Sequence, residues 1–190
     1  MSKYEILTRD EMSPRQRQVA DAIAAGPRGS LKGPFIALIH NPELANHLQA
    51  LGEHLRFRTG LPGHLVEIAV LITAHRWSSD YEWLAHARIG REAGLSDEVI
   101  TSLGTGRRPD ALDSDASLIY DFAYETAWQG RPSDSAFSAL KSRFGSATSL
   151  DVLAVCGYYT TLAFILNAAE LPLPSGKLPA GWVQRAASVE

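Results

Sequence analysis

An 18-residue segment without a charged side chain, Val152 to Ala169 ("VLAVCGYYTTLAFILNAA"), most strongly limits what this chain can fold into. Its length is close to the ~20 residues that a membrane-spanning helix needs. Tyrosine, threonine and asparagine residues interrupt it, however, and no cluster of Lys or Arg flanks it as at the cytoplasmic end of a spanning helix. We therefore expect a helix at the centre of a bundle or at a subunit interface, and no association with a membrane.

The rest of the sequence also favours helices. Apolar residues recur at spacings of three and four, and no sustained alternation of apolar and polar residues predicts a strand. Proline after a capping residue, at Ser13–Pro14 and Asn41–Pro42, is typical of a helix start. We expect an all-α fold with helices at about 14–25, 42–57, 62–77, 80–93, 113–129, 133–144 and 149–169, and a short helix after Ser96.

Length and composition indicate one globular domain over residues 1–190, with a proline-rich tail at 171–190 that should wrap the surface. The formal net charge of −3 contains no long run of one sign, which argues against nucleic-acid partners. The N-terminus lacks the apolar stretch of a signal peptide, and the single cysteine, Cys156, excludes an internal disulfide. We expect a cytoplasmic protein whose partners are small molecules or copies of itself.

A carboxylate and an imidazole lie four residues apart in the predicted helix at 80–93. At 100° per residue, Ser79, Glu82, His86, Ile89 and Ala93 fall on one stripe. Because Ile89 and Ala93 should face the core, Glu82 and His86 point inward with them. An unpaired buried carboxylate costs several kcal/mol, and a neighbouring imidazole lowers that cost, so the two should form a pair.

The preceding predicted helix contains a third ionisable group. Glu67 is the only charged residue between Leu65 and Ala74, a run that is apolar almost all round and should be buried. A lone carboxylate in that setting should have a raised pKa or a close partner. If the two helices pack antiparallel, Glu67 can approach His86, which is nearer to it in height than Glu82 is.

The same residues allow other interpretations. Glu82 and His86 could form an ordinary i to i+4 pair on a half-exposed face, while Glu67 caps a neighbouring helix. Glu67, Glu82 and His86, with His75, could instead hold a divalent metal ion. A non-catalytic helical oligomer is a third possibility. Cys156 has no CxxC partner and should be inert.

The segment "LPGHLVEIAVLITAHRWSSDYEWLAHARIGREAGLSDEVITSL", Leu61 to Leu103, resembles the carboxymuconolactone decarboxylase family. That family shares its all-helical fold with the alkylhydroperoxidase D-like (AhpD-like) proteins. The resemblance lies in Glu67 within an apolar helix, the "YEWLAH" element and the helix break at "AGLSDEVI". It implies a helical bundle of this type with its motif core at 61–103. With the uncharged helix at 152–169, it also implies a homo-oligomer: a dimer, trimer or hexamer.

The peroxidase branch of this fold carries a glutamate, the two cysteines of a CxxC motif and a histidine. When Glu67 and His86 are aligned with that motif, the cysteines fall at Ser79 and Glu82, so both thiols are absent. Peroxide reduction by a thiolate with a resolving thiol is therefore not expected. The decarboxylase branch lacks the CxxC motif and uses histidine and acidic groups. Glu67, Glu82 and His86 match such a site as its catalytic residues.

The resemblance implies cofactor-independent decarboxylation, or a related proton transfer, on a small carboxylated lactone or similar metabolite of aromatic catabolism, with no metal. Loss of carbon dioxide leaves negative charge on a carbon, which an acid that works near pH 7 must protonate. We expect His86 to be that acid, Glu67 to become suitable through burial, and Glu82 to hold the imidazole in one tautomer.

Several residues near these positions are expected to bind the substrate. They are Ser79, Tyr81, Trp83 and Arg58. Tyr81 and Trp83 also suit a core or an interface. The substrate carboxylate needs a cation, for which Arg56, Arg58 and His64 are the candidates.

Overall fold

The structure, a computed structural model, describes residues 2–182. Within that range no strand occurs, so the predicted all-α fold is confirmed. The helices of the described residues are α1 (Pro14–Ala25), α2 (Phe35–Leu38), α3 (Pro42–Phe57), α4 (Gly63–Arg76), α5 (Asp80–Glu92), α6 (Asp97–Gly104), α7 (Ser114–Gln129) and α8 (Asp134–Ala169). The short α2 is the one that the sequence pattern did not predict.

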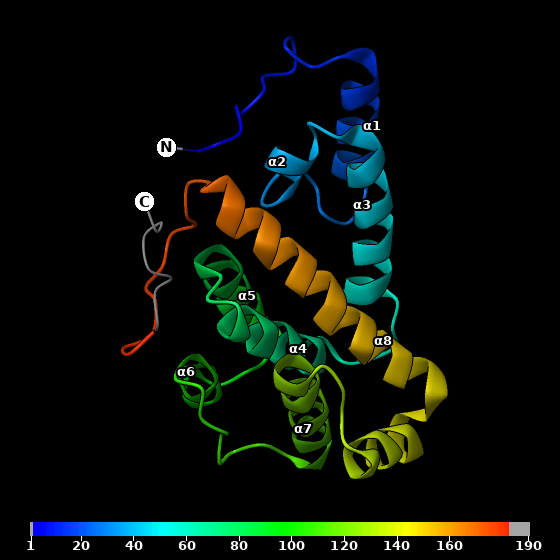
Figure 1. The fold of residues 1–190 in the computed structure, drawn as a ribbon, viewed down its shortest axis with the longest axis vertical. Coiled ribbons are helices and arrows are strands. Elements are labelled where there is room, and N and C mark those ends of the chain that lie inside the picture. Colours follow the sequence, from blue (N-terminus) through cyan, green and yellow to red (C-terminus); the bar gives the residue numbers. More distant parts are fainter. Residues whose placement is uncertain (1, 183–190) are drawn as a thin grey trace.

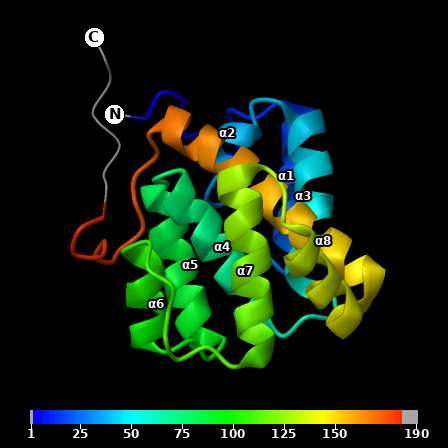
Figure 2. The ribbon, with the colours of Figure 1, turned by 60° about the horizontal axis from the view of Figure 1, so that its bottom comes forward.

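The long helix α8 runs diagonally through the molecule, with α1 to α3 on one side and α4 to α7 on the other (Figure 1). The second central helix is α4, which packs against α5, α7 and α8; Figure 2 shows it beside α5 and α7. Every residue from Leu65 to Ala74 is buried. A helix with neighbours on all sides needs an apolar surface all round, which explains the composition of α4 and encloses Glu67.

A bend divides α8 where the sequence predicts two helices, at 133–144 and 149–169. Gly145 has φ 85° and ψ 172°, which are not helical values, while the residues on both sides are helical. Glycine adopts a positive φ without the steric penalty of other residues. The element α8 therefore consists of two helices that meet at Gly145, as the sequence predicted, and Gly145 sets the direction of the second helix, which crosses the bundle.

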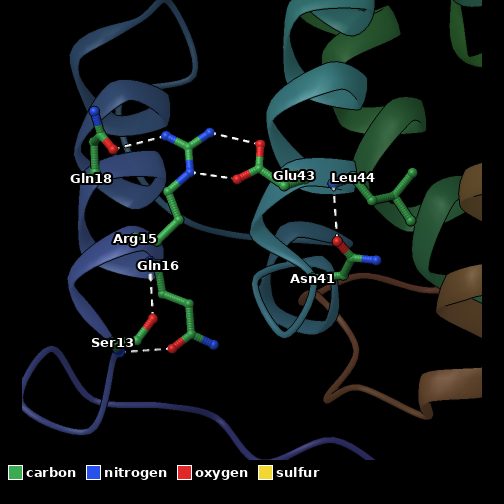
Figure 3. A network of polar contacts seen from close by, with 7 residues as sticks. All are labelled: Ser13, Arg15, Gln16, Gln18, Asn41, Glu43 and Leu44. Atoms are coloured by element: carbon green, nitrogen blue, oxygen red, sulfur yellow. Dashed lines mark hydrogen bonds and ion pairs between the residues drawn. The ribbon is translucent and has the colours of Figure 1, made fainter.

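Capping residues fix the start of α1 and α3 as predicted. Ser13 accepts from the backbone N–H of Gln16, whose side chain accepts from the backbone N–H of Ser13, forming a capping box (Figure 3). At the start of α3, Oδ1 of Asn41 accepts from the backbone N–H of Leu44. Arg15 then joins α1 to α3 through two contacts with Glu43, at 2.6 and 2.7 Å.

By length and composition, α8 is apolar enough to cross a membrane. However, 50% of its most apolar window is buried inside the structure. The core helix of a soluble protein passes the same test, and α8 packs against helices from both sides of the bundle as such a core helix does. The fold is thus consistent with the soluble protein expected from the sequence.

The segment after α8 does more than wrap the surface. Trp182 is 9% exposed, its ring lies 4.8 Å from that of Trp83, and its Nε1 donates to Asp80 at 2.7 Å. In α6, Gly104 leaves room for Pro179, because a Cβ at position 104 would collide with the proline ring. The tail is therefore anchored on α5 and α6. The rest of the predicted surface segment, 183–190, lies outside the described residues.

Candidate active site

The α4–α5 hairpin places Glu67 and His86 side by side. A short connection joins the two helices, and Ser78 within it has φ 46°. Across the hairpin, His86 Nδ1 lies 2.7 Å from Glu67 Oε2 and forms a hydrogen bond with it. The close partner that the apolar surroundings of Glu67 require is therefore His86.

Glu82 approaches the other side of the same ring. His86 Nε2 lies 3.2 Å from Glu82 Oε2, one helical turn earlier in α5. The exposed fractions are 4% for Glu67, 3% for Glu82 and 6% for His86. From α8, Tyr159 packs its ring across the imidazole, with centroids 4.9 Å apart and planes at 83°. An ordinary pair on a half-exposed face does not describe this arrangement, because the imidazole is enclosed between two buried carboxylates.

The two carboxylates determine the charge of His86. Burial alone would lower the pKa of this imidazole, because a cation loses its hydration in the interior. The charges and hydrogen bonds of Glu67 and Glu82 outweigh burial and raise the pKa to about 9. His86 is therefore an imidazolium at neutral pH, with one ring N–H directed at each carboxylate.

The contacts of the two glutamates suggest roles that differ from those expected from the sequence. Glu67 orients the imidazole through Nδ1, which was the role expected of Glu82. Glu82 contacts His86 through Oε2, whereas its Oε1 is buried without a hydrogen-bond partner in the part of the chain that the structure describes. Since Glu82 also lines a pocket, Oε1 is the oxygen that can bond to a bound molecule.

A pocket of about 680 Å³ opens over Glu82 and His86. This volume is in the range of small-molecule sites, which run from ~300 to ~1,000 Å³. Its apolar wall includes Phe57, Ala85, Ile89 and Leu162. Its basic side chains are Arg28, Lys32, Arg56 and Arg88. The pocket thus combines an apolar wall, an excess of positive charge and a buried chain of ionisable groups.

The side chains predicted to contact substrate divide between the pocket and the core. Tyr81 lines the pocket. Trp83 does not, because it is 1% exposed and packs on Trp182. Ser79 is fully buried at the base of the hairpin, and its hydroxyl has no partner among the described residues. The structure therefore brings Tyr81 to the site but not Trp83 or Ser79.

Of the cations considered from the sequence, only Arg56 lines this pocket. Arg58 follows the last turn of α3, where its exposed side chain pairs with Glu53. His64 does not line the pocket either.

Sequence reasoning missed three residues of the site. Arg28 and Lys32 come from the loop between α1 and α2, and Tyr159 comes from α8. The signal for the two cations is the loop "GPRGSLKGP", which holds them among glycines and prolines. Nothing local in that loop relates it to α5, so only the tertiary fold reveals the contact.

A metal site does not fit this geometry. Ligands must converge on one point, but the His86 ring lies between Glu67 and Glu82 and directs one nitrogen at each. Across residues 2–182, no group of three or more His, Cys, Asp or Glu side chains could hold a metal ion. His75 packs between two tryptophan rings instead, at centroid distances of 6.0 and 5.5 Å.

The sequence matches no protein-family model and no curated protein. Solved structures with the same fold include the alkylhydroperoxidase AhpD core of an uncharacterized peroxidase-related protein from Ralstonia eutropha JMP134. It is 18% identical with a TM-score of 0.75, over 97% of this chain and 98% of that chain. A protein of unknown function from Agrobacterium tumefaciens, named as a candidate antioxidant defence protein AhpD, is also 18% identical. Its TM-score is 0.65, over 76% of this chain and 100% of that chain.

These likenesses show the fold. The chain has the AhpD-like all-helical architecture, as the sequence predicted. Fold alone does not assign a reaction, so the function must be argued from the residues of the site.

Proposed function

We propose that this protein is a cofactor-independent enzyme that transfers a proton on a small carboxylated substrate, in the manner of a carboxymuconolactone decarboxylase. One observation carries the proposal: the buried chain Glu67–His86–Glu82 ends in an unpartnered carboxylate oxygen at a pocket of about 680 Å³. A carboxylate in contact with an imidazolium can give or take a proton without a metal or an organic group.

Glu67, His86 and Glu82 each have a defined part in the proposed reaction. The bond between the ring carbon and its carboxylate breaks, carbon dioxide leaves, and the electron pair remains on the carbon, delocalised into the conjugated carbonyl. His86 passes its Nε2 proton to the Glu82 carboxylate, which relays it to that carbon. Glu67 keeps the ring in place through Nδ1 during the transfer. A proton from solvent restores the imidazolium.

Thiol-based peroxide reduction is the alternative that the names of the two AhpD-like structures suggest. It requires a thiolate and a resolving thiol, whereas this chain has one cysteine. Cys156 is 3% exposed, and burial raises the pKa of its thiol to about 12. The residues therefore support proton transfer in preference to thiol peroxidase activity.

Carboxylated lactones, carboxymuconolactone among them, should release carbon dioxide when incubated with the purified protein. In D₂O the product should carry deuterium at the former carboxylated carbon, because the proton arrives from an exchangeable site. Carbon dioxide release and NMR of the product measure this. The matched control, Cys156→Ser, should retain activity within about twofold because the thiol is inert. Thiol-dependent hydroperoxide consumption that Cys156→Ser abolishes would instead favour a peroxidase.

We also propose that the chain assembles as a homo-oligomer through an exposed apolar face of α8. Leu150 and Phe164 lie four turns apart on this face and are 64% and 48% exposed. A contiguous exposed apolar patch marks an interaction surface, and the proposal is that this face of α8 forms one. Light scattering at micromolar concentration should give a dimer, trimer or hexamer, and Phe164→Glu should lower the mass without loss of helix. The control Leu44→Glu, on α3, should not change the mass. A monomeric wild-type protein would contradict the proposal.

A further inference from the structure

Two buried polar atoms at the pocket have no partner among residues 2–182: the Nε of Arg28 and the Oε1 of Glu82. Buried donors and acceptors are nearly always paired in folded proteins, so an unpaired one needs an explanation. Here one atom is a donor and the other an acceptor, and the residues line the same pocket. Together they are complementary to a molecule that carries both an acceptor and a donor.

Contacts from three parts of the fold hold the guanidinium of Arg28 in place. Its terminal nitrogen donates to the hydroxyl of Tyr158 at 3.1 Å, and its central carbon lies 4.6 Å from the centroid of the Phe35 ring. In α3, Gly52 provides the space, because a Cβ there would collide with both Arg28 and Tyr158. An arginine positioned in advance loses less freedom when it binds a carboxylate.

Arg28 and Arg56 have charge available for a ligand. Neither forms an ion pair with a carboxylate in the described part of the chain. Arg88, which lines the same pocket, is instead paired with Glu92 at 2.9 Å. Lys32, which also lines the pocket, is likewise in no ion pair among the described residues. The excess positive charge of the pocket is thus available at Arg28, Arg56 and Lys32, which favours an anionic group there.

Arg28, Arg56 and Glu82 line the same pocket. Burial raises the pKa of the Tyr158 hydroxyl, and Glu82 raises it further, while Arg28 and Arg56 oppose the increase. All three charges therefore act on the same hydroxyl. The apolar side chains of Phe57, Ile89 and Leu162 line the remaining wall, so the body of the ligand should be apolar.

We propose that the pocket binds a small cyclic carboxylate that also carries a hydroxyl group. Arg28 and Arg56 bind the carboxylate, and the hydroxyl donates to Oε1 of Glu82. Arg28 and Arg56 then determine substrate specificity from outside the α4–α5 hairpin. The inference rests on the proposed function in one respect, since it brings the ligand against the carboxylate that transfers the proton.

Isothermal titration calorimetry of the full chain with simple probes tests this inference. The probes are 2-, 3- and 4-hydroxybenzoate, which place the two groups at three separations, with benzoate and 4-hydroxybenzyl alcohol as compounds that lack one group each. At least one hydroxybenzoate should bind with a Kd below about 1 mM. Compared with that hydroxybenzoate, benzoate should bind the protein at least about fivefold more weakly, and 4-hydroxybenzyl alcohol at least about tenfold more weakly.

Variants assign the contacts. Arg28→Gln and Arg56→Gln should each weaken the binding of hydroxybenzoate at least about tenfold. Arg15→Gln, outside the pocket, should change the Kd less than about twofold, because that side chain is already paired with Glu43. Glu82→Gln should remove the preference for hydroxybenzoate over benzoate. If Arg28→Gln fails to fold, Arg56→Gln and the wild-type probe series decide the matter alone. Failure of all three hydroxybenzoates to bind at 10 mM, or equal binding to the Arg28 or Arg56 variants, overturns the proposal.

The outcome can be separated from that of the decarboxylase proposal, because binding is measured without turnover. If the probes bind as expected and no carboxylated lactone is decarboxylated, the proposed ligand site is supported and the proposed reaction is contradicted. If the wild-type protein decarboxylates lactones and the Arg28→Gln and Arg56→Gln variants do so equally fast, the proposed reaction is supported and the proposed ligand site is contradicted.

Discussion

Replacement of His86 by asparagine should abolish turnover and strongly destabilise the protein near neutral pH. The change removes the group that supplies protons to Glu82, and loss of such a group typically lowers kcat by ~10²–10⁴. It also leaves Glu67 and Glu82, 4% and 3% exposed, facing each other without a cation. Stranding a buried charge costs about 3–5 kcal/mol. Activity assays and denaturant unfolding at pH 7 measure the two effects.

The effect of His86→Asn on the free energy of unfolding should depend on pH. In the wild-type protein the pKa of His86 is raised from 6.5 to about 9. The stability that the imidazolium contributes is therefore fully present below pH 6.5 and is lost as the pH rises through about 9. The difference between wild type and variant should therefore be large near neutral pH and should decrease as the pH rises through about 9.

His54 offers a matched control, because it also pairs with a carboxylate. Its Nε2 lies 3.0 Å from Asp151, but its side chain is 50% exposed. Exposed pairs contribute little, so His54→Asn should change the free energy of unfolding by less than about 1 kcal/mol at any pH. If His86→Asn were as mild as His54→Asn, or if it kept wild-type turnover, the buried chain of ionisable groups would have neither role.

Local periodicity was sufficient to predict most of the fold. The apolar composition of α4 follows from its position between other helices, and the caps at Ser13 and Asn41 mark helix starts that the structure has. The kink at Gly145 was not predictable in the same way. A glycine between two helical patterns signals a loop as readily as a bend, and packing across the bundle selects the bend.

The candidate site shows the same division between local and tertiary information. Glu67, Glu82 and His86 could be found because each is polar on a face that is otherwise apolar. Their roles could not, because these depend on where the pocket lies and on which oxygen of Glu82 has no partner among the described residues. Arg28 was missed for a related reason: its loop contacts α5 only through the tertiary fold. Sequence therefore identified the buried ionisable chain but not the groups that would hold a ligand against it.

The resemblance to the peroxidase motif gives position 82 a particular meaning. In the alignment on Glu67 and His86, Glu82 takes the place of one cysteine of that motif, and its side chain contacts His86 and lines the pocket. A thiolate there would serve as a redox-active nucleophile, whereas a carboxylate there can exchange protons and accept hydrogen bonds but cannot form a disulfide. In the proposed reaction, the side chain at position 82 is therefore what separates proton transfer from thiol chemistry.

Glu82→Gln should lower kcat by ~10²–10⁴ while changing the free energy of unfolding by less than about 1.5 kcal/mol. The side chains have nearly the same shape, and the amide oxygen can still accept from Nε2–H of His86. Glu67 continues to hold the imidazole at Nδ1, 2.7 Å away. At the position of Oε1, however, the amide nitrogen cannot accept a proton. Steady-state kinetics and denaturant unfolding of the same preparation therefore separate a catalytic role from a structural one.

Glu67→Gln is the matched comparison, because it makes the same chemical change on the side of the imidazole away from the pocket-lining glutamate. It leaves Oε1 of Glu82 in place, so kcat should fall only about tenfold. It removes one of the two carboxylates that raise the pKa of His86, so the alkaline limb of the pH–rate profile should move down from about 9. Equal loss of kcat in the two variants with equal loss of stability would contradict the assigned roles, because the two glutamates would then act only as structural partners of His86.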